Sequence, residues 1–376
     1  MNYLVLFLAA LFLAFSNGAN DNFKGVATLF GSGTTDYRKA INWATITTFL
    51  GTIASVFIAN ALLKNFSGKG LVPDELVMSP QFAISIVSGA AITVYLATKI
   101  GMPISTTHSL VGALAGSGII AVGSAFNFER LTGTFLIPLI ISPLLAAVLS
   151  LITYLIFRKT RLSLGVTKET CLCVGNEYKP IMEISQGEGT IYFDQRGSNT
   201  KLTVGDESRC VDVYKGKVLG VSAQRILNTA HFLSSGVVSF ARGLNDTPKI
   251  VGLLLVINVM NIKWGLIAIG IAMAIGGLFK AKKVGHIISK EITPMNSGQG
   301  FTANLMTGLL VTTASIHGMP VSTTHVSVGS IFGIGTATKK ANVKTVSHIL
   351  LSWALTLPVA AVLSGAIYLL TKIFLI

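Results

Sequence analysis

The run GMPISTTHSLVGALAGSG at residues 101–118 recurs as GMPVSTTHVSVGSIFGIG at residues 318–335, with eleven of eighteen positions identical and no gap. Two further blocks repeat in the same order. GANDNFKGVATL, from Gly18, parallels GLNDTPKIVGLL, from Gly243. AAVLSLITYL, from Ala146, parallels AAVLSGAIYL, from Ala360. Three blocks in one order indicate a chain built from a duplicated half.

The composition around these blocks is that of a membrane protein. Of the 376 residues, 51% are hydrophobic and 12% are charged, whereas a soluble domain carries about 25% charged residues. Lipid must therefore be the solvent for most of the chain. The formal net charge of +14 fits basic residues that collect in cytoplasmic loops. The sequence lacks the interleaved aromatic and basic residues that are typical of a nucleic-acid surface.

A polar stretch at residues 158–217 separates the two copies. It holds ten Lys or Arg and eight Asp or Glu, so the remaining 316 residues carry only 26 charges. The alternating runs Thr190-Ile-Tyr-Phe and Val211-Asp-Val-Tyr, bounded by glycines, predict a small β-rich unit. The predicted organisation is a first membrane repeat at residues 1–157, a cytoplasmic insert at 158–217 and a second membrane repeat at 218–376.

Basic residues set the predicted topology through the positive-inside rule. They place both termini outside the cell and the insert inside, for a multi-pass protein of the plasma (inner) membrane. Residues 81–122 must then begin and end outside, so they can reverse only at mid-depth, with residues 101–108 as the tip. Residues 293–335 form the matching hairpin from the opposite face. The predicted fold is an all-α polytopic membrane protein with two inverted-topology repeats, broken helices and re-entrant hairpins, a layout typical of secondary transporters.

Two carboxylates are expected deep in the membrane. Asp21 and Asp246 follow Asn20 and Asn245 at predicted helix breaks, while every other acidic residue outside the insert falls near a predicted loop or membrane edge. A carboxylate in hydrocarbon needs a cation, a proton or a water-lined cavity. One such pair could be an Asx turn that kinks a helix. Its recurrence in both halves favours coordination of a cation by these four residues.

Each hairpin tip places three hydroxyl residues at a predicted helix N-terminus. Unpaired backbone N–H groups and the positive helix end attract an anion there, and hydroxyls add donors. A single serine would only cap the helix, but three hydroxyls in both halves exceed what capping needs. The sequence therefore predicts binding of inorganic phosphate by the two tips together with Asn20, Asp21, Asn245 and Asp246. The tip residues are Ser105, Thr106, Thr107, Ser322, Thr323 and Thr324.

Sodium is the predicted coupling ion, and no other cofactor is expected. An anion beside two aspartates is repelled unless cations lie between them, and a cluster of oxygen ligands suits a hard ion. Protons are the rival, because His108 and His325 follow the hydroxyl triplets and could titrate near physiological pH. A buried, hydrogen-bonded structural role is favoured for both histidines.

Three other features lie close to these motifs. Lys24 and Lys249 are three residues beyond the aspartates. Pairing with the carboxylates is the preferred interpretation of both lysines, and contact with phosphate is the alternative. For Arg242, contact with phosphate and snorkelling to the cytoplasmic surface both stay open. Small-xxx-small stripes in the hairpin arms predict close helix packing. They are formed by Gly112, Gly116, Gly329 and Gly333.

The two Asn-Asp blocks and the two PxSTTH tips resemble the motifs of the inorganic phosphate transporter (PiT) family of sodium- or proton-coupled symporters. The resemblance covers both halves and leaves out only the insert. It implies transport of inorganic phosphate, an inverted repeat and a homodimer. The eukaryotic form of the signature has a second Asn shortly after the Asn-Asp pair, where this chain has Phe23, Lys24 and Lys249, so the driving ion could differ.

The predicted function is secondary active transport that couples sodium entry to uptake of inorganic phosphate by alternating access, and not an enzyme activity. A proton-coupled phosphate or sulfate symporter is the alternative. An intramembrane hydrolase using Ser105 or Ser322, with His108 or His325 and an aspartate, ranks lower, as does a channel. Two equivalent sets of residues that face opposite leaflets fit a carrier better than the single asymmetric nucleophile set of a hydrolase.

Overall fold

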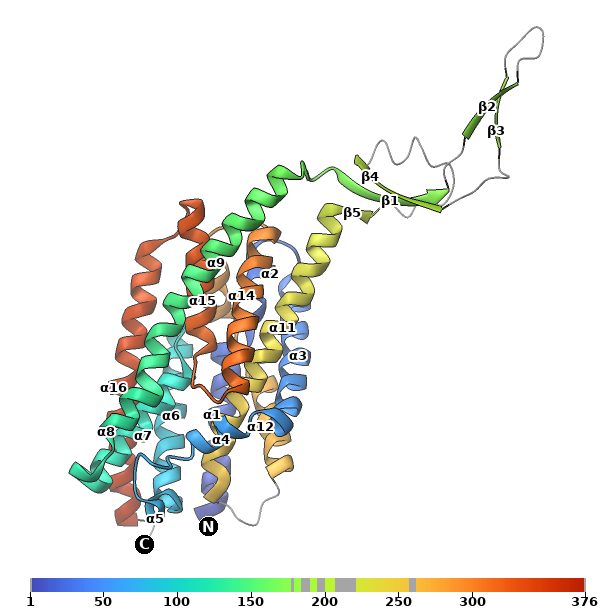
Figure 1. Cartoon of the computed structure of the whole chain (residues 1–376). Helices are drawn as coiled ribbons and strands as arrows, with labels where there is room; N and C mark the ends of the chain where they lie inside the picture. Colours follow the sequence, from blue (N-terminus) through green and yellow to red (C-terminus); the bar gives the residue numbers. More distant parts are fainter. Residues whose placement is uncertain are drawn as a thin grey trace. The chain divides into compact units, whose positions relative to one another are not determined.

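The computed structural model describes residues 2–176, 179–183, 190–194, 200–206, 221–256 and 262–374. The chain forms two compact units, which are shown in Figure 1. Unit 1 comprises Met1–Tyr154 and His231–Ile376, and unit 2 comprises Leu155–Ala230. Unit 1 contains the duplicated blocks and is helical.

The first half contains nine α-helices, a 3-10 turn η1 and two further short helical turns within the described residues. They are α1 (Asn2–Asp21), η1 (Asn22–Val26), α2 (Ala27–Gly31), α3 (Tyr37–Ile58), α4 (Asn60–Asn65), α5 (Asp74–Val77), α6 (Pro80–Ile100), α7 (Thr106–Val122), η2 (Gly123–Ala125), α8 (Phe128–Arg130), η3 (Leu131–Leu136) and α9 (Ile137–Ser163). The second half has α11 (Ala223–Gly252), η4 (Leu253–Val256), α12 (Ile262–Lys280), α13 (Lys282–His286), η5 (Ile287–Glu291), α14 (Ser297–Ile316), α15 (Thr323–Thr338) and α16 (Val343–Phe374).

The helices have the length and surface of membrane spans. Seven helical segments among the described residues are long and apolar enough to cross a bilayer. Their outward faces stay apolar: on α9, Ile140 and Leu144 are 64% and 65% exposed. A soluble protein would bury such a row of aliphatic side chains, whereas lipid solvates it. The prediction of a polytopic helical membrane protein is confirmed.

Local sequence explains both hairpin tips. Helix α6 ends where Gly101 adopts a left-handed φ of 87°, a conformation that glycine reaches without a steric penalty. Pro103 follows and blocks continuation of the helix, and Ser105 then caps α7. The second tip repeats this design, with Gly318 at a φ of 71° and Ser322 as the cap of α15.

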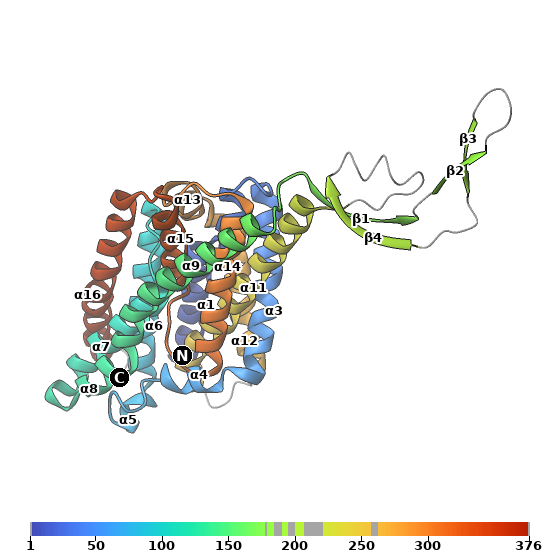
Figure 2. The same cartoon turned by 45° about the horizontal axis from the view of Figure 1, so that its top comes forward.

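The first arms of the two hairpins are long. These arms, α6 and α14, have 21 and 20 residues, or about 30 Å at 1.5 Å per residue, which is the hydrocarbon thickness of a bilayer. Figure 2 shows α5 and α8, which flank the first hairpin, at one end of unit 1, and α13, which precedes the second hairpin, at the other. The hairpins therefore enter from opposite ends, while their orientation in a membrane stays a prediction.

Each hairpin packs against the long final helix of the other half. A Cβ atom added to Gly112 or Gly116 of α7 would lie 2.3 or 2.0 Å from a carbonyl oxygen of α16. One added to Gly329 or Gly333 of α15 would lie 2.3 or 2.1 Å from a carbonyl oxygen of α9. Such close approach requires glycine. The packing role predicted for these four glycines is confirmed, and the contacts show that the two halves exchange their hairpins.

The predicted helix break is present in the first half only. Helix α1 ends at Asp21 and passes into the 3-10 turn η1. In the second half, α11 continues through Asn245 and Asp246 and changes to 3-10 geometry only at Leu253. The expectation of a break at the second Asn-Asp pair is therefore wrong. Pro248 lies in α11 but does not end it, because the tertiary packing around this buried segment outweighs the local preference of proline.

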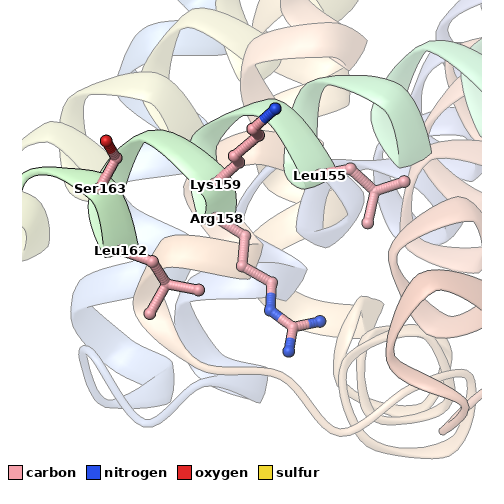
Figure 3. Close-up of a pocket in the computed structure, with 5 residues that line it drawn as sticks. All are labelled: Leu155, Arg158, Lys159, Leu162 and Ser163. Atoms are coloured by element: carbon pink, nitrogen blue, oxygen red, sulfur yellow. The ribbon is translucent and has the colours of Figure 1, made fainter.

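Unit 2 contains the β-structure expected in the insert. Strand β1 (Thr170–Asn176) pairs antiparallel with β4 (Thr200–Asp206) and β5 (Val221–Ser222), and β2 (Lys179–Glu183) forms a hairpin with β3 (Thr190–Asp194). The predicted strand at Thr190 is confirmed, while the run from Val211 lies outside the described residues. A hollow in this unit, drawn in Figure 3, is lined by five residues of α9 alone.

Candidate functional site

The two deep carboxylates meet through one asparagine. Asn17, on α1, donates its side-chain amide to Asp21 Oδ2 at 3.2 Å and to Asp246 Oδ2 at 3.2 Å. It also donates to Thr106 Oγ1 in the first tip at 3.0 Å. Asp21 and Asp246 are 1% and 3% exposed. The structure thus brings both aspartates and one tip into a single buried polar centre.

Arg242 is a member of this centre. Its guanidinium donates to the side-chain oxygens of Asn17 and, at 3.0 Å, of Asn22, and Nε lies 3.7 Å from Asp246 Oδ2. The side chain is 1% exposed. Snorkelling to the surface, one of the two roles left open for Arg242, is therefore wrong. The sequence analysis did not identify Asn17. In the repeat, Asn17 and Arg242 occupy equivalent positions, each one residue before the glycine that starts an Asn-Asp block.

The ammonium group of Lys24 lies in a cage of oxygen atoms. It donates to Asn20 Oδ1 at 2.9 Å, to Ile104 O at 2.7 Å and to Thr324 Oγ1 at 2.6 Å, and it forms an ion pair with Asp21. These four oxygen atoms outnumber the three hydrogens of a charged ammonium group, so every hydrogen of the group has an acceptor. The pairing of Lys24 with its aspartate is confirmed.

Lys249 lies in a matching cage. Its Nζ donates to Thr107 Oγ1 and to Val321 O, each at 2.7 Å, and lies 3.6 Å from Asp246 Oδ1. The side chain is 1% exposed. Each lysine therefore binds a backbone carbonyl in the tip of its own half and a threonine hydroxyl in the tip of the other half.

Asn20 and Asn245 anchor the first arms of the hairpins. Asn20 donates to Thr98 Oγ1 at 3.0 Å, and Asn245 Oδ1 accepts from Ser315 Oγ at 3.2 Å. Thr98 and Ser315 are equivalent in the repeat. Both asparagines are fully buried, so each holds a tip against the Asn-Asp segment of its own half.

The tip serines act as helix caps. Ser105 Oγ accepts from the backbone N–H of His108 at 3.1 Å, and Ser322 Oγ accepts from that of His325 at 3.3 Å. Their hydroxyl hydrogens can still be donated to a ligand. Helix capping needs only one hydroxyl in each tip, and the serine supplies it. The threonines are therefore the hydroxyl donors that capping does not use.

The threonine that directly follows the capping serine has different hydrogen-bond partners in the two halves. Thr106 donates to Asp21 Oδ2 at 3.1 Å and accepts from Asn17. Its repeat equivalent, Thr323, is 5% exposed, and no hydrogen bond of its side chain is found within the described ranges. This leaves the donor and acceptor capacity of the Thr323 hydroxyl open to water or a ligand. Thr323 is therefore the tip hydroxyl most available to a substrate.

The rings of the two histidines that follow the tip triplets contact each other. The His108 and His325 rings lie 4.4 Å apart, and His325 stacks on Trp353 and hydrogen-bonds Leu139 O through Nδ1. In the part of the chain that the structure describes, His108 Nδ1 and His325 Nε2 have no hydrogen-bond partner, and neither ring bonds a serine hydroxyl. The buried, hydrogen-bonded role predicted for both histidines is supported for His325, whereas His108 is half-buried and its ring has no hydrogen bond within the described residues. The serine–histidine pair that a hydrolase needs is not assembled.

The centre carries a positive charge. Three basic side chains, Lys24, Lys249 and Arg242, surround the two aspartates, which leaves a formal charge of +1. The sequence argument assumed that only sodium could neutralise the two aspartates before an anion binds. The structure shows that basic side chains already do so. Among the described residues no cluster of three or more His, Cys, Asp or Glu could hold a metal ion. A cation here would depend on amide, hydroxyl and carbonyl oxygens as well.

These features define a multi-pass membrane transport protein, with a buried polar centre built from both halves between two hairpin tips. The chain belongs to the phosphate transporter family, whose model matches residues 17–364.

Curated relatives agree with this family. A Pyrococcus furiosus protein named "Putative phosphate permease" is 28% identical, over 97% of this chain and 95% of its own. A Rhizobium meliloti protein named "Probable low-affinity inorganic phosphate transporter" is 26% identical, over 96% and 94%. A solved structure titled "The sodium-dependent phosphate transporter" covers 99% of both chains, with a TM-score of 0.75 and 22% identity, and this likeness shows the fold.

Proposed function

We propose that this protein is a secondary active transporter that couples sodium entry to uptake of inorganic phosphate by alternating access. The observation that carries the proposal is the exchange of tip contacts at the buried centre. Each cage combines a lysine and a carbonyl from one half with a threonine from the other. A site closed by both halves at once can be opened by moving one half against the other, as alternating access requires.

The chemistry of the centre fits an oxyanion. Two helix N-termini, at α7 and α15, supply oriented N–H groups, and the surrounding charge is positive. Arg242 adds a fixed cation whose Nε has no hydrogen-bond partner within the described residues, and arginine suits phosphate oxygens. We assign phosphate binding to the tip residues Ser105, Thr106, Thr107, Ser322, Thr323 and Thr324, with Asn20, Asp21, Asn245, Asp246 and Arg242.

Sodium coupling is supported by the oxygen ligands and by the name of the structural neighbour. We assign sodium coordination to Asp21, Asn20, Asp246 and Asn245; oxygens of Asp21 and Asn20 bind Lys24 Nζ, and Asp246 Oδ1 lies 3.6 Å from Lys249 Nζ. Carboxylate, amide, carbonyl and hydroxyl oxygens are the ligands that hard cations prefer. The neighbour's sodium dependence is stated for that protein and supports the same ion here.

The remaining assignments rest on the sequence. We propose that the transporter works as a homodimer in the plasma membrane, with both termini outside and the insert in the cytoplasm. Substituted-cysteine labelling from each side tests the orientation: cysteines at Arg38 and Lys159 should react only with reagent supplied from inside. Labelling of either from outside contradicts the orientation.

Uptake by proteoliposomes tests the function. The purified full chain should accumulate labelled phosphate when an inward sodium gradient is imposed, and choline in place of sodium should abolish accumulation. Excess unlabelled sulfate should compete weakly. Accumulation driven by a proton gradient in choline would instead identify a proton-coupled carrier, and complete inhibition by sulfate would identify a sulfate carrier. Non-saturable flux would indicate a channel.

A further inference from the structure

The lysine cages have the ligands of a cation site. Around Lys24 Nζ lie a carboxylate, an amide oxygen, a backbone carbonyl and a hydroxyl, contributed by Asp21, Asn20, Ile104 and Thr324. Around Lys249 Nζ lie the carbonyl of Val321, the hydroxyl of Thr107 and the Asp246 carboxylate. No other positively charged group contacts these oxygens within the described ranges, apart from Arg242 beside Asp246.

These cages overlap the positions proposed for sodium. Asp21 and Asn20, two of the proposed sodium ligands, are both bonded to Lys24. A sodium ion that coordinates these oxygens cannot share them with the ammonium group, because the same lone pairs would serve both cations and the two positive charges would repel at contact distance. Occupation of a cage by lysine and by sodium is therefore mutually exclusive.

We propose that the ammonium groups of Lys24 and Lys249 occupy the two cation positions of the empty carrier and compete with sodium for them. The inference rests on the proposed sodium coupling and names the groups that regulate it. Each lysine acts as a tethered counter-ion that keeps its aspartate paired when no sodium is bound. Sodium displaces the ammonium groups, which then lie free beside the tips and can donate to phosphate.

The charge of the centre supports such an exchange. The three basic and two acidic side chains give the empty centre a formal charge of +1. One sodium ion in each cage and one phosphate dianion cancel, so the loaded centre again carries +1. Sodium alone would raise it to +3, and the dianion alone would lower it to −1. Because uncompensated charge in a dry interior is strongly unfavourable, the sodium-only form is the most disfavoured, whereas the empty and fully loaded forms carry the same charge.

Sodium titration of the purified full chain tests the competition without requiring transport. Thermal unfolding is followed at constant total salt while sodium replaces choline, because a ligand of the folded state raises the unfolding temperature. In Lys24→Asn and in Lys249→Asn, the half-stabilising sodium concentration should fall by about tenfold, the range of a moderate coupling between two ligands. Lys39→Asn, at an exposed lysine of α3, is the matched control and should behave as wild type.

The result that overturns the proposal is a half-stabilising sodium concentration that is unchanged or higher in the lysine variants. Absence of any response to sodium in all of the proteins also overturns it. Lys249→Gln, whose side chain fills more of the vacated space, gives a second test if the Asn variants fold poorly. Failure of the wild-type chain to transport phosphate would count against the proposed function, and a sodium response confined to the lysine variants would still support the competition.

Discussion

Replacing Asp246 by Asn removes one negative charge from the buried centre and leaves the shape of the side chain nearly unchanged. The carboxylate lies 3.6 Å from Lys249 Nζ and 3.7 Å from Arg242 Nε. Unit charges at such a distance interact by about 4 kcal/mol at an effective dielectric constant of 20. Removing one partner of a buried ion pair costs about 3–5 kcal/mol because the other charge is left uncompensated.

This magnitude predicts near-complete loss of transport. A penalty of about 3 kcal/mol lowers the population of a correctly organised centre by about 100-fold, and a sodium ion in that cage loses the same attraction. Sodium-driven uptake of labelled phosphate by proteoliposomes should therefore fall by about two orders of magnitude. Asp21→Asn should behave alike, because Asp21 pairs with Lys24 in the other cage.

The control is Asp36→Asn. Asp36 is an exposed cap of α3 that accepts from the backbone N–H of Lys39 at 2.9 Å, and this bond holds the pKa of the Asp36 carboxyl below its ordinary value. Asn caps helices as well as Asp does, so uptake should match wild type. Sodium-stimulated uptake at the wild-type rate in Asp246→Asn, in protein that elutes as a single folded species, would refute the assigned role of this carboxylate.

Three further changes address the tips and their support. Thr323→Val should raise the half-saturating phosphate concentration by about tenfold, the value of one hydrogen bond to a charged group, while Thr323→Ser restores it; an unchanged value removes Thr323 from the site. Ser105→Ala should lower the free energy of unfolding by about 1 kcal/mol through loss of the cap, with phosphate affinity altered less than in Thr323→Val. Gly116→Val should reduce the yield of folded protein, because a Cβ there lies 2.0 Å from Ala361 O. Gly133→Ala, at an open position, should not reduce it. A normal yield of Gly116→Val contradicts the packing argument.

Local chemistry made the hairpin tips predictable. Glycine for a left-handed turn, proline to stop a helix and serine to cap the next one are read directly from residues 101–105 and 318–322, and both tips fold as that pattern indicates. The course of a helix through a buried segment was not predictable, because it depends on tertiary packing against neighbouring helices. The unbroken course of α11 through Asp246 was missed for the same reason.

Repeats predicted which residues matter but not which of them touch. Asp21, Asp246, Lys24 and Lys249 were found from their spacing, and the structure places all four in one centre. Asn17 was missed because its equivalent position in the second half holds a different residue, Arg242, so no shared motif marks it. Its importance arises from Arg242 and Asp246, which are more than two hundred residues away and come near it only after the halves have packed.

The exchanged hairpins make the two halves of this chain mutually dependent. Helix α7 rests in the glycine-lined contact with α16, and α15 rests in the same kind of contact with α9. A half on its own would leave the glycine-lined face of its hairpin and the facing surface of its long final helix unpacked, so each half needs the other for stability. Two separately expressed halves, 1–157 and 218–376, should thus reassemble in the membrane, while neither should accumulate alone.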